Sequence, residues 1–280
     1  MIQAADGVEL YGCSFFADQS TGHLVIQHGL GEHGDRYRHL VAMFNNAGIS
    51  VHLLDLRGHG RSKGVQGGGQ SVLQLALDLE AFIEHLTVSS YIQGQPVLLG
   101  HSLGAVVTTT LALRHSNQFQ LAGLAISAAP FQIPLSISQQ VKQIAGRVLA
   151  KIAPNLILEA GLNAEDLSHD KSVVDAYLAD PLVHGKLGVQ LGMSLIECGQ
   201  QLIDKAAQLK IPLWAAHGKD DKIASYQGTE QFFMRAGSED KSLHIYDDLY
   251  HEIFNEYDTS PRQDLLDFVS DCLETSAGAG

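Results

Sequence analysis

The segment Pro96-Val97-Leu98-Leu99-Gly100-His101-Ser102-Leu103-Gly104-Ala105 places a serine directly between a short apolar run and a stretch of small residues. The run over 97–99 predicts a buried strand, and the small residues predict a helix packed closely behind it. Glycines two residues before and after Ser102 leave room for a tight turn, which would expose the hydroxyl at a sheet end beside helical N–H groups. The pattern therefore predicts a nucleophile elbow. The alternative, a surface Gly-Ser turn, does not need the apolar strand that leads in.

Similar apolar runs recur along the chain and are too short for helices. They are nearly continuous rather than alternating, which is typical of strands covered on both faces. Helical periods lie between them, over 37–44, 72–86 and 265–273. Strands that alternate with helices predict an α/β fold: a mostly parallel central sheet with helices on both faces and ligands at the carboxyl ends of the strands. The runs lie at 24–26, 51–54, 97–99, 124–126, 213–216 and 243–246.

This alternation breaks between Phe131 and Gln208. Apolar residues from Ile137 to Ile152 recur with a helical period, and no clear strand follows until 211–212. We therefore expect a core formed by 1–130 and 209–275, interrupted by a helical cap, or lid, over 131–208. Ordinary helical packing against the core is the other interpretation of this segment, and the two are compatible. The Ser-Ala-Gly tail over 276–280 is expected to be disordered.

The composition excludes several classes of partner. Of 280 residues, 45% are hydrophobic, and 18 lysines and arginines stand against 31 acidic residues, which gives a net charge of −13. This charge disfavours nucleic acid and anionic lipid. Three scattered cysteines indicate neither a disulfide framework nor a metal or redox site. We expect no metal, nucleotide or other cofactor, and the oligomeric state is left open.

The N-terminus carries acids rather than the basic start of a signal peptide, and no apolar run approaches the roughly 20 residues that span a bilayer. We expect a soluble, cytoplasmic protein.

A serine nucleophile needs a base and an acid, which follow it in the chain order serine, acid, histidine in this architecture. His251 lies just past the last predicted strand, so its ring can reach the sheet end, whereas His244 lies inside that strand and is better explained by packing. The preceding strand leads into a loop with two acids. We expect Asp221 to orient the histidine, with Asp220 as the alternative.

Two backbone N–H groups are expected to form an oxyanion hole. One belongs to Leu103, immediately after the predicted nucleophile, and the other to Leu30 in the turn after the first buried strand. The glycines at 29 and 31 are also compatible with a simple tight turn. A phosphate loop is not indicated, because neither Gly-x-x-x-x-Gly-Lys nor Gly-x-Gly-x-x-Gly occurs here.

Six motifs spread over almost the whole chain are similar to those of a known family. They are His28-Gly29-Leu30-Gly31-Glu32-His33 with Arg36-Tyr37, Asp55-Leu56-Arg57-Gly58-His59-Gly60-Arg61-Ser62, Gly100-His101-Ser102-Leu103-Gly104, Asp180-Pro181-Leu182-Val183, the segment from Gly218 to Asp221, and Tyr250-His251-Glu252. In these motifs and their order, the chain resembles the α/β-hydrolase superfamily and, within it, the monoacylglycerol lipase and lysophospholipase family of serine hydrolases. The resemblance implies an α/β-hydrolase fold with an inserted helical cap.

The resemblance also implies roles for individual residues. Ser102 corresponds to the nucleophile, His251 to the general base and then acid, and Asp221 to the residue that orients His251, with the oxyanion donors at Leu30 and Leu103. The family's pocket for the glycerol head group corresponds here to Glu32, Arg36, His101 and Tyr177. Each has another explanation from the sequence, since Glu32 and Arg36 can pair at a helix start and Tyr177 can pack. Arg57 and His59 are expected to hold their loop rather than contact substrate.

The expected activity is hydrolysis of monoacylglycerol to glycerol and a fatty acid through an acyl-enzyme. A lysophospholipase or a broad carboxylesterase is the alternative, and a non-catalytic small-molecule receptor is a distant one. Ser102 excludes epoxide hydrolases and haloalkane dehalogenases, which use an aspartate there, whereas haloperoxidases and carbon–carbon bond hydrolases stay open. The expected partner is a small lipid ester, with at most transient contact to neutral or zwitterionic lipid surfaces. Individual cap residues that line an acyl tunnel are not predicted.

Overall fold

The computed structural model describes residues 1–68, 70–114, 120–132, 152–153 and 155–278. Over these residues the central sheet has seven strands in the order β11-β10-β7-β6-β4-β5-β3. All neighbouring pairs are parallel except β3 and β5. The strands are β3 (Gly12–Phe15), β4 (Gly22–Gln27), β5 (Ile49–Leu54), β6 (Val97–His101), β7 (Gly123–Ser127), β10 (Leu213–Gly218) and β11 (Lys241–Tyr246). The predicted mostly parallel sheet is confirmed.

The six predicted apolar runs all lie in strands of this sheet, whereas the shorter strands carry no such run. The half-buried edge strand β3 was not predicted. Neither were the two antiparallel pairs β1 (Ile2–Gln3) with β2 (Glu9–Leu10) and β8 (Ile157–Glu159) with β9 (Lys186–Gly188). The expectation of no clear strand within 131–208 is therefore wrong. Strands of two or three residues are too short to show a period of two.

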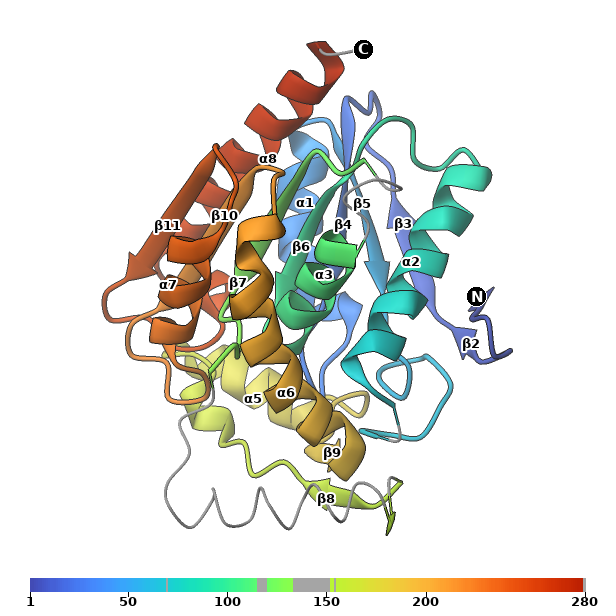
Figure 1. Cartoon of the computed structure of the whole chain (residues 1–280), viewed down its shortest axis with the longest axis vertical. Coiled ribbons are helices and arrows are strands. Elements are labelled where there is room, and N and C mark those ends of the chain that lie inside the picture. Colours follow the sequence, from blue (N-terminus) through green and yellow to red (C-terminus); the bar gives the residue numbers. More distant parts are fainter. Residues whose placement is uncertain (69, 115–119, 133–151, 154, 279–280) are drawn as a thin grey trace.

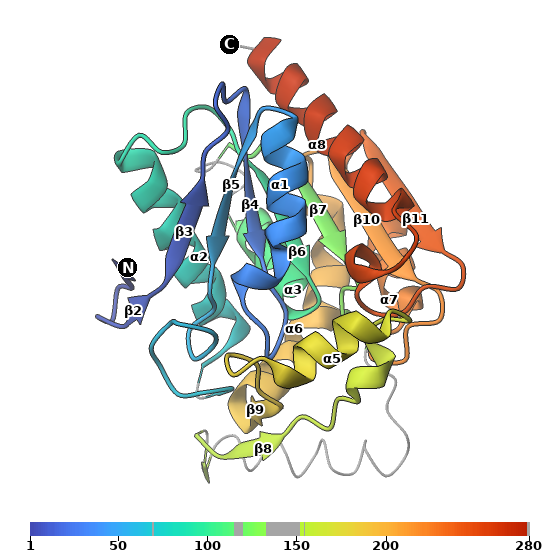
Figure 2. The same cartoon turned by 180° about the vertical axis from the view of Figure 1, so that it is seen from behind.

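Helices cover both faces of the sheet (Figures 1 and 2). The helices α2, α3, α6 and α7 pack on one face in one hydrophobic cluster, and α1 and α8 pack on the other face in a second cluster. Successive residues of β6 show the division, since Leu98 belongs to the first cluster and Val97 and Leu99 to the second. A strand with both faces buried must be apolar throughout. The helices are α1 (Arg38–Asn46), α2 (Val72–Val88), α3 (Leu103–Arg114), α5 (Lys171–Ala179), α6 (Val189–Lys205), α7 (Tyr226–Arg235) and α8 (Ser260–Gly278), with 3-10 turns η1 (Gly34–Tyr37), η2 (Ala164–Asp166), η3 (Ala206–Gln208) and η4 (Ile253–Asn255).

In the described part of the segment between β7 and β10, the elements β8, α5 and β9 lie beyond the carboxyl ends of the parallel strands, at the bottom of Figure 1. The helix α6 starts there and runs along one face of the sheet, where it packs against α3 and α7. The helix expected over 137–152 lies outside the described residues except for Ile152. At the other end of the chain, residues 276–278 continue α8 rather than forming a disordered tail, and 279–280 lie outside the described residues.

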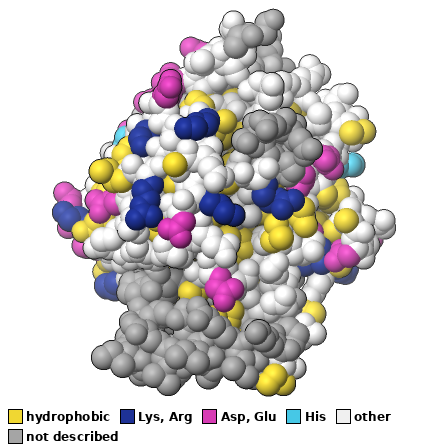
Figure 3. All heavy atoms as spheres, viewed as in Figure 1, with side chains coloured by type: hydrophobic (Ala, Val, Ile, Leu, Met, Phe, Trp, Pro, Cys, Tyr) yellow, Lys and Arg dark blue, Asp and Glu magenta, His cyan; other side chains and the backbone are white. Residues whose placement is uncertain are grey.

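The surface in the orientation of Figure 1 carries lysine and arginine side chains interspersed with aspartates and glutamates (Figure 3). Within the described residues, no helix combines the length and apolarity needed to cross a bilayer.

Candidate active site

Ser102 lies in the turn between β6 and α3 with a φ of 52°, a left-handed conformation that is uncommon for a residue other than glycine. Its backbone N–H donates to Ser127 O at 2.9 Å. A Cβ on Gly104 would lie 2.1 Å from Gln27 O, and a Cβ on Gly100 would lie 2.3 Å from Thr108 Oγ1. Both flanking positions therefore require glycine, and the strained serine has the geometry of a nucleophile elbow.

The structure brings Asp221 and His251 together at the carboxyl ends of β10 and β11. His251 Nδ1 donates to Asp221 Oδ2 at 2.6 Å, and both side chains are buried. Asp221 Oδ1 accepts from the N–H groups of Ile223 and Ala224 at 2.7 and 3.0 Å. Asp220, the alternative, is exposed. The geometry therefore distinguishes the two acids that the sequence left open.

His251 lies beside the elbow. Its ring centroid is 4.9 Å from that of His101, the residue directly before Ser102. Ser102 itself is partly exposed, whereas His101 is buried and its Nδ1 lies 2.9 Å from Ser127 Oγ. Burial, reinforced by the neighbouring His251, lowers the pKa of His101 to about 4.

The electrostatics of the buried pair suit a general base. Burial alone would raise the pKa of Asp221, but the ring N–H groups of His251 and His217 hold it well below its ordinary range. Burial alone would lower the pKa of His251, yet the Asp221 carboxylate outweighs it and the net shift is upward. Asp221 thus remains ionised and strengthens His251 as a proton acceptor.

The turn that carries the Leu30 N–H lies against the elbow. A Cβ on Gly29 would be 3.1 Å from Ser102 Cβ. His28 fixes the start of this turn, because its Nδ1 donates to Gly29 O at 2.8 Å while its Nε2 accepts from Leu56 N at 2.9 Å. The turn and the first residue of α3, Leu103, therefore border Ser102 from two sides, as two oxyanion donors require.

The side chain of Glu32 stabilises the same turn by accepting a hydrogen bond from its backbone. Its buried carboxylate accepts from Gly29 N at 2.6 Å, from Tyr37 OH at 2.8 Å and from Arg36 Nη1 at 2.7 Å. Burial opposes ionisation, but the positive charge of Arg36, with His101 and His28, lowers the pKa of Glu32 to about 2. The predicted Glu32–Arg36 pair at a helix start is therefore present, with Glu32 just before η1 and Arg36 within it.

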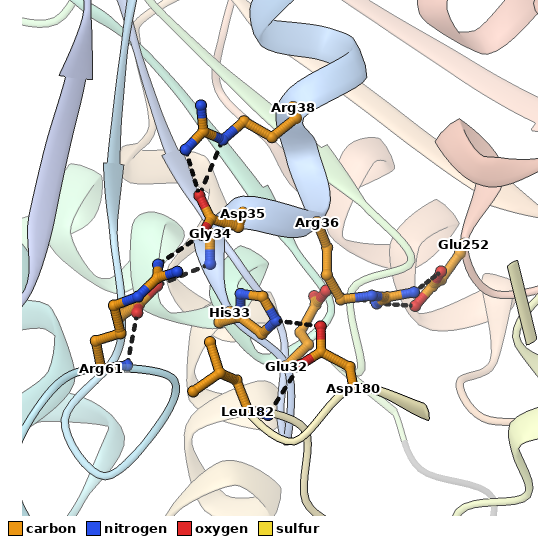
Figure 4. Close-up of polar contacts among 11 residues, drawn as sticks. Glu32, His33, Gly34, Asp35, Arg36, Arg38, Arg61, Asp180, Leu182 and Glu252 are labelled. Atoms are coloured by element: carbon orange, nitrogen blue, oxygen red, sulfur yellow. Dashed lines mark hydrogen bonds and ion pairs between the residues drawn. The ribbon is translucent and has the colours of Figure 1, made fainter. Parts of the chain in front are cut away.

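Arg36 also reaches the loop that carries His251 (Figure 4). Its guanidinium makes two hydrogen bonds to Glu252, at 2.5 and 2.7 Å, and lies 4.9 Å from the ring centroid of Tyr177 in α5. Burial alone would lower the pKa of Arg36, but Glu252 and Glu32 raise it well above its ordinary value. Of the four residues expected in a head-group pocket, three are thus joined in one contact set, and His101 packs against it through Tyr37, with ring centroids 6.5 Å apart.

Arg57 and His59 hold their loop as predicted. Arg57 pairs with the buried Asp78 at 2.7 Å and with Asp6 at 2.6 Å. His59 Nδ1 donates to Arg57 O at 3.1 Å. Among the residues that the structure describes, no group of three or more His, Cys, Asp and Glu side chains is arranged to hold a metal ion.

The segment between β7 and β10 is tied to both sides of the site. On one side His33 Nε2 lies 2.9 Å from Asp180 Oδ2, and His184 N donates to Gly31 O at 2.9 Å. On the other side the buried Glu256 accepts from the His169 N–H at 2.9 Å. The chain on the two sides of α5 is therefore anchored to residues 31–33 and to the loop after His251.

Sequence reasoning missed three residues that support the site: His217, Glu252 and Glu256. His217 lies at the end of an apolar strand, where packing is the simplest explanation of a histidine, although it stands four residues before Asp221. Nothing in the sequence distinguishes the two glutamates from ordinary solvated residues of a loop. The motif Tyr250-His251-Glu252 includes one of them, and that proximity to His251 was the available signal.

The model of the family described as serine aminopeptidase, S33, matches residues 18–258. The chain belongs to this family. Monoacylglycerol lipase of Mycolicibacterium smegmatis is 36% identical over 255 residues, which cover 88% of this chain and 85% of that protein. Phospholipase YtpA of Bacillus subtilis is 28% identical, with 86% and 91% of the two chains covered. The crystal structure of Paleococcus ferrophilus monoacylglycerol lipase superposes with a TM-score of 0.86 at 30% identity and covers 94% of this chain and 99% of that one. The family is one of serine hydrolases with the α/β-hydrolase fold, and it includes lipases and esterases.

Proposed function

We propose that the protein hydrolyses carboxylic esters of fatty acids, with a monoacylglycerol as its substrate. The observation that carries the proposal is the 2.6 Å hydrogen bond between His251 and Asp221 beside the strained Ser102. Relatives named as monoacylglycerol lipases support the choice of substrate. A lysophospholipid is the second candidate, because another relative over most of the chain is named as a phospholipase.

In the proposed mechanism the Ser102 hydroxyl attacks the ester carbonyl while His251 Nε2 takes its proton. The N–H groups of Leu30 and Leu103 bind the oxyanion of the tetrahedral intermediate. His251 then gives the proton to the glycerol oxygen as the carbon–oxygen bond breaks, which leaves an acyl group on Ser102. A water molecule then attacks the acyl carbon while His251 takes its proton, and His251 returns this proton to the Ser102 oxygen as the acyl–oxygen bond breaks and the fatty acid leaves.

We assign the polar end of the substrate pocket to Glu32, Arg36, His101 and Tyr177. Glu32 and Arg36 use most of their hydrogen-bonding capacity on the protein, so they shape this end rather than supply most of its direct contacts. The Tyr177 hydroxyl is placed differently, since it would lie 3.6 Å from a Cβ on Gly31 in the oxyanion turn. It is the group of the four best placed to donate to a glycerol hydroxyl.

We propose that residues 131–208 act as a cap between the two parts of the core, 1–130 and 209–275. Several apolar side chains of its described part are 39–76% exposed, which supports transient contact with a neutral or zwitterionic lipid surface. They are Ile152, Leu156, Leu158, Leu162 and Leu178. The net charge of −13 disfavours strong adsorption to anionic lipid.

The test compares kcat/KM for a long-chain monoacylglycerol, lysophosphatidylcholine and nitrophenyl butyrate. Monoacylglycerol is expected to be the best of the three, and Ser102→Ala is expected to abolish turnover of all. Tyr177→Phe should raise KM for monoacylglycerol and leave nitrophenyl butyrate unchanged, with the remote Tyr91→Phe as the matched control. Far higher kcat/KM on lysophospholipid or the short ester would contradict the head-group assignment.

A further inference from the structure

The carboxylate of Asp221 receives four N–H groups, and one of them belongs to a side chain outside the catalytic set described above. Oδ1 accepts from two backbone N–H groups, and Oδ2 accepts from His251 Nδ1 at 2.6 Å and from His217 Nε2 at 3.0 Å. The side chains of Asp221 and His217 are both 0% exposed. Two imidazole rings therefore share one oxygen of the acid, away from water.

The orientation of His217 is fixed from its other side. Its Nδ1 lies 2.8 Å from the hydroxyl oxygen of Thr229 in α7. Because an ionised carboxylate only accepts hydrogen bonds, His217 Nε2 must carry the proton that faces Asp221. In the neutral ring the Thr229 hydroxyl then donates to Nδ1, so that the strand β10 and the helix α7 together hold the imidazole.

We infer that His217 is a positioning residue for the acid of the proposed catalytic triad. Its Nε2–H, supported by Thr229, holds Asp221 Oδ2 in line with His251 and shares the negative charge that His251 would otherwise face alone. This role rests on the proposed function of Ser102, Asp221 and His251. If His217 only filled space at the end of β10, its substitution would change folding stability and would not change the pKa of His251.

The inference predicts the direction of two changes. Without the His217 N–H, the charge on Oδ2 interacts with His251 alone, so protonated His251 becomes more stable and its pKa rises. The carboxylate also loses one of its two side-chain partners and can rotate, so kcat falls while substrate binding is unchanged. Among the described residues, the other titratable groups that interact with His251 include His101, Glu252 and Glu32, and substitution at 217 leaves all three in place.

The experiment compares His217→Met, which removes the donor, with His217→Gln, whose amide N–H reaches a similar position. His244→Gln is the matched control, because the His244 ring lies 5.6 Å from that of Trp214 and 3.4 Å from Asp264 rather than against Asp221. Two readouts are used: the pKa of His251 from an NMR titration, which needs no turnover, and kcat and KM for nitrophenyl butyrate as a function of pH.

In His217→Met we expect kcat to fall about 10- to 100-fold, the range for loss of a hydrogen bond to a charged group, with KM within about twofold of the wild type. The pKa of His251 and the acid limb of the pH profile should both move upward. His217→Gln should restore most of kcat and the wild-type pKa. If His217→Met does not fold, Thr229→Val tests the same support and should shift both readouts in the same direction by a smaller factor.

An unmoved His251 pKa in His217→Met, or in Thr229→Val if the former does not fold, overturns the inference. Equal kcat losses in the Gln and Met variants at equal stability also overturn it. Failure of the proposed function is distinguishable, since it appears as a wild type without Ser102-dependent turnover, whereas the NMR titration still decides the role of His217.

Discussion

Arg36 joins the two loops that flank the candidate nucleophile, so its removal is expected to damage both stability and activity. Its three hydrogen bonds to Glu32 and Glu252 are 2.5–2.7 Å long. The Arg36 side chain is 10% exposed and each glutamate side chain is 5% exposed. Arg36→Met fills similar space but leaves two buried carboxylates without a cation.

Removing one partner of a buried ion pair costs about 3–5 kcal/mol. Because two buried carboxylates lose their cation at once, we expect Arg36→Met to lower the free energy of unfolding by about 5 kcal/mol in urea denaturation at pH 7.5. Arg38→Met is the matched control, because Arg38 pairs with Asp35 on the surface with a side chain 56% exposed, and its loss should cost under about 1 kcal/mol. Figure 4 shows both arginines.

The double variant Arg36→Met/Glu252→Gln removes one of the two stranded charges. It should therefore be more stable than Arg36→Met, which gives a coupling free energy of about 1–3 kcal/mol in the double-mutant cycle. In kinetic assays kcat should fall in Arg36→Met, because both the turn that carries Leu30 and the loop of His251 lose a tether. A cost in Arg36→Met no greater than that in Arg38→Met would refute the buried bridge.

Three further predictions concern the acid, the elbow and the buried histidines. Asp221→Ala should lower kcat by about 10⁴-fold, whereas Asp220→Ala should keep nearly full activity in the same ester assay. Gly104→Ala should unfold at a much lower temperature than Gly278→Ala in calorimetry, because its new Cβ would lie 2.1 Å from Gln27 O, whereas the Cβ at Gly278 meets nothing within 4 Å and that glycine has no positive φ. Burial and the neighbouring His23 lower the pKa of His52 to about 3, so the folded state binds this proton less readily than the unfolded chain does. The free energy of unfolding should therefore fall as the pH decreases from about 6.5 toward 3. Between pH 7.5 and 5 it should fall less in His52→Gln than in the wild type. Equal decreases in the two proteins would contradict this prediction.

The features that sequence predicted best are those with a local cause. The glycines around Ser102 are required by atoms within the same strand–turn–helix unit and the adjacent strand end, so the spacing alone reveals the turn. The position of Asp221 follows from β10, which is buried throughout, and that of His251 follows from the apolar residues within the half-buried edge strand β11.

Contacts between distant segments left no such pattern. Arg36 and Glu252 are separated by 216 residues, and the carboxylate that pairs with Arg36 could not be identified from either segment alone. His217 was hidden for a different reason, since a histidine in an apolar strand gives no sign of which neighbour its ring will meet. The short pair β8 and β9 depends on pairing across the segment rather than on its own residues.

The central claim is that Ser102 is the nucleophile of an ester hydrolase. Incubation of the native protein with a fluorophosphonate, followed by intact-mass measurement and peptide mapping, tests it most directly. We expect one adduct, on Ser102, that is absent from Ser102→Ala and strongly slowed in Asp221→Ala. No adduct on the native wild type, or an undiminished adduct in Ser102→Ala, would contradict the account.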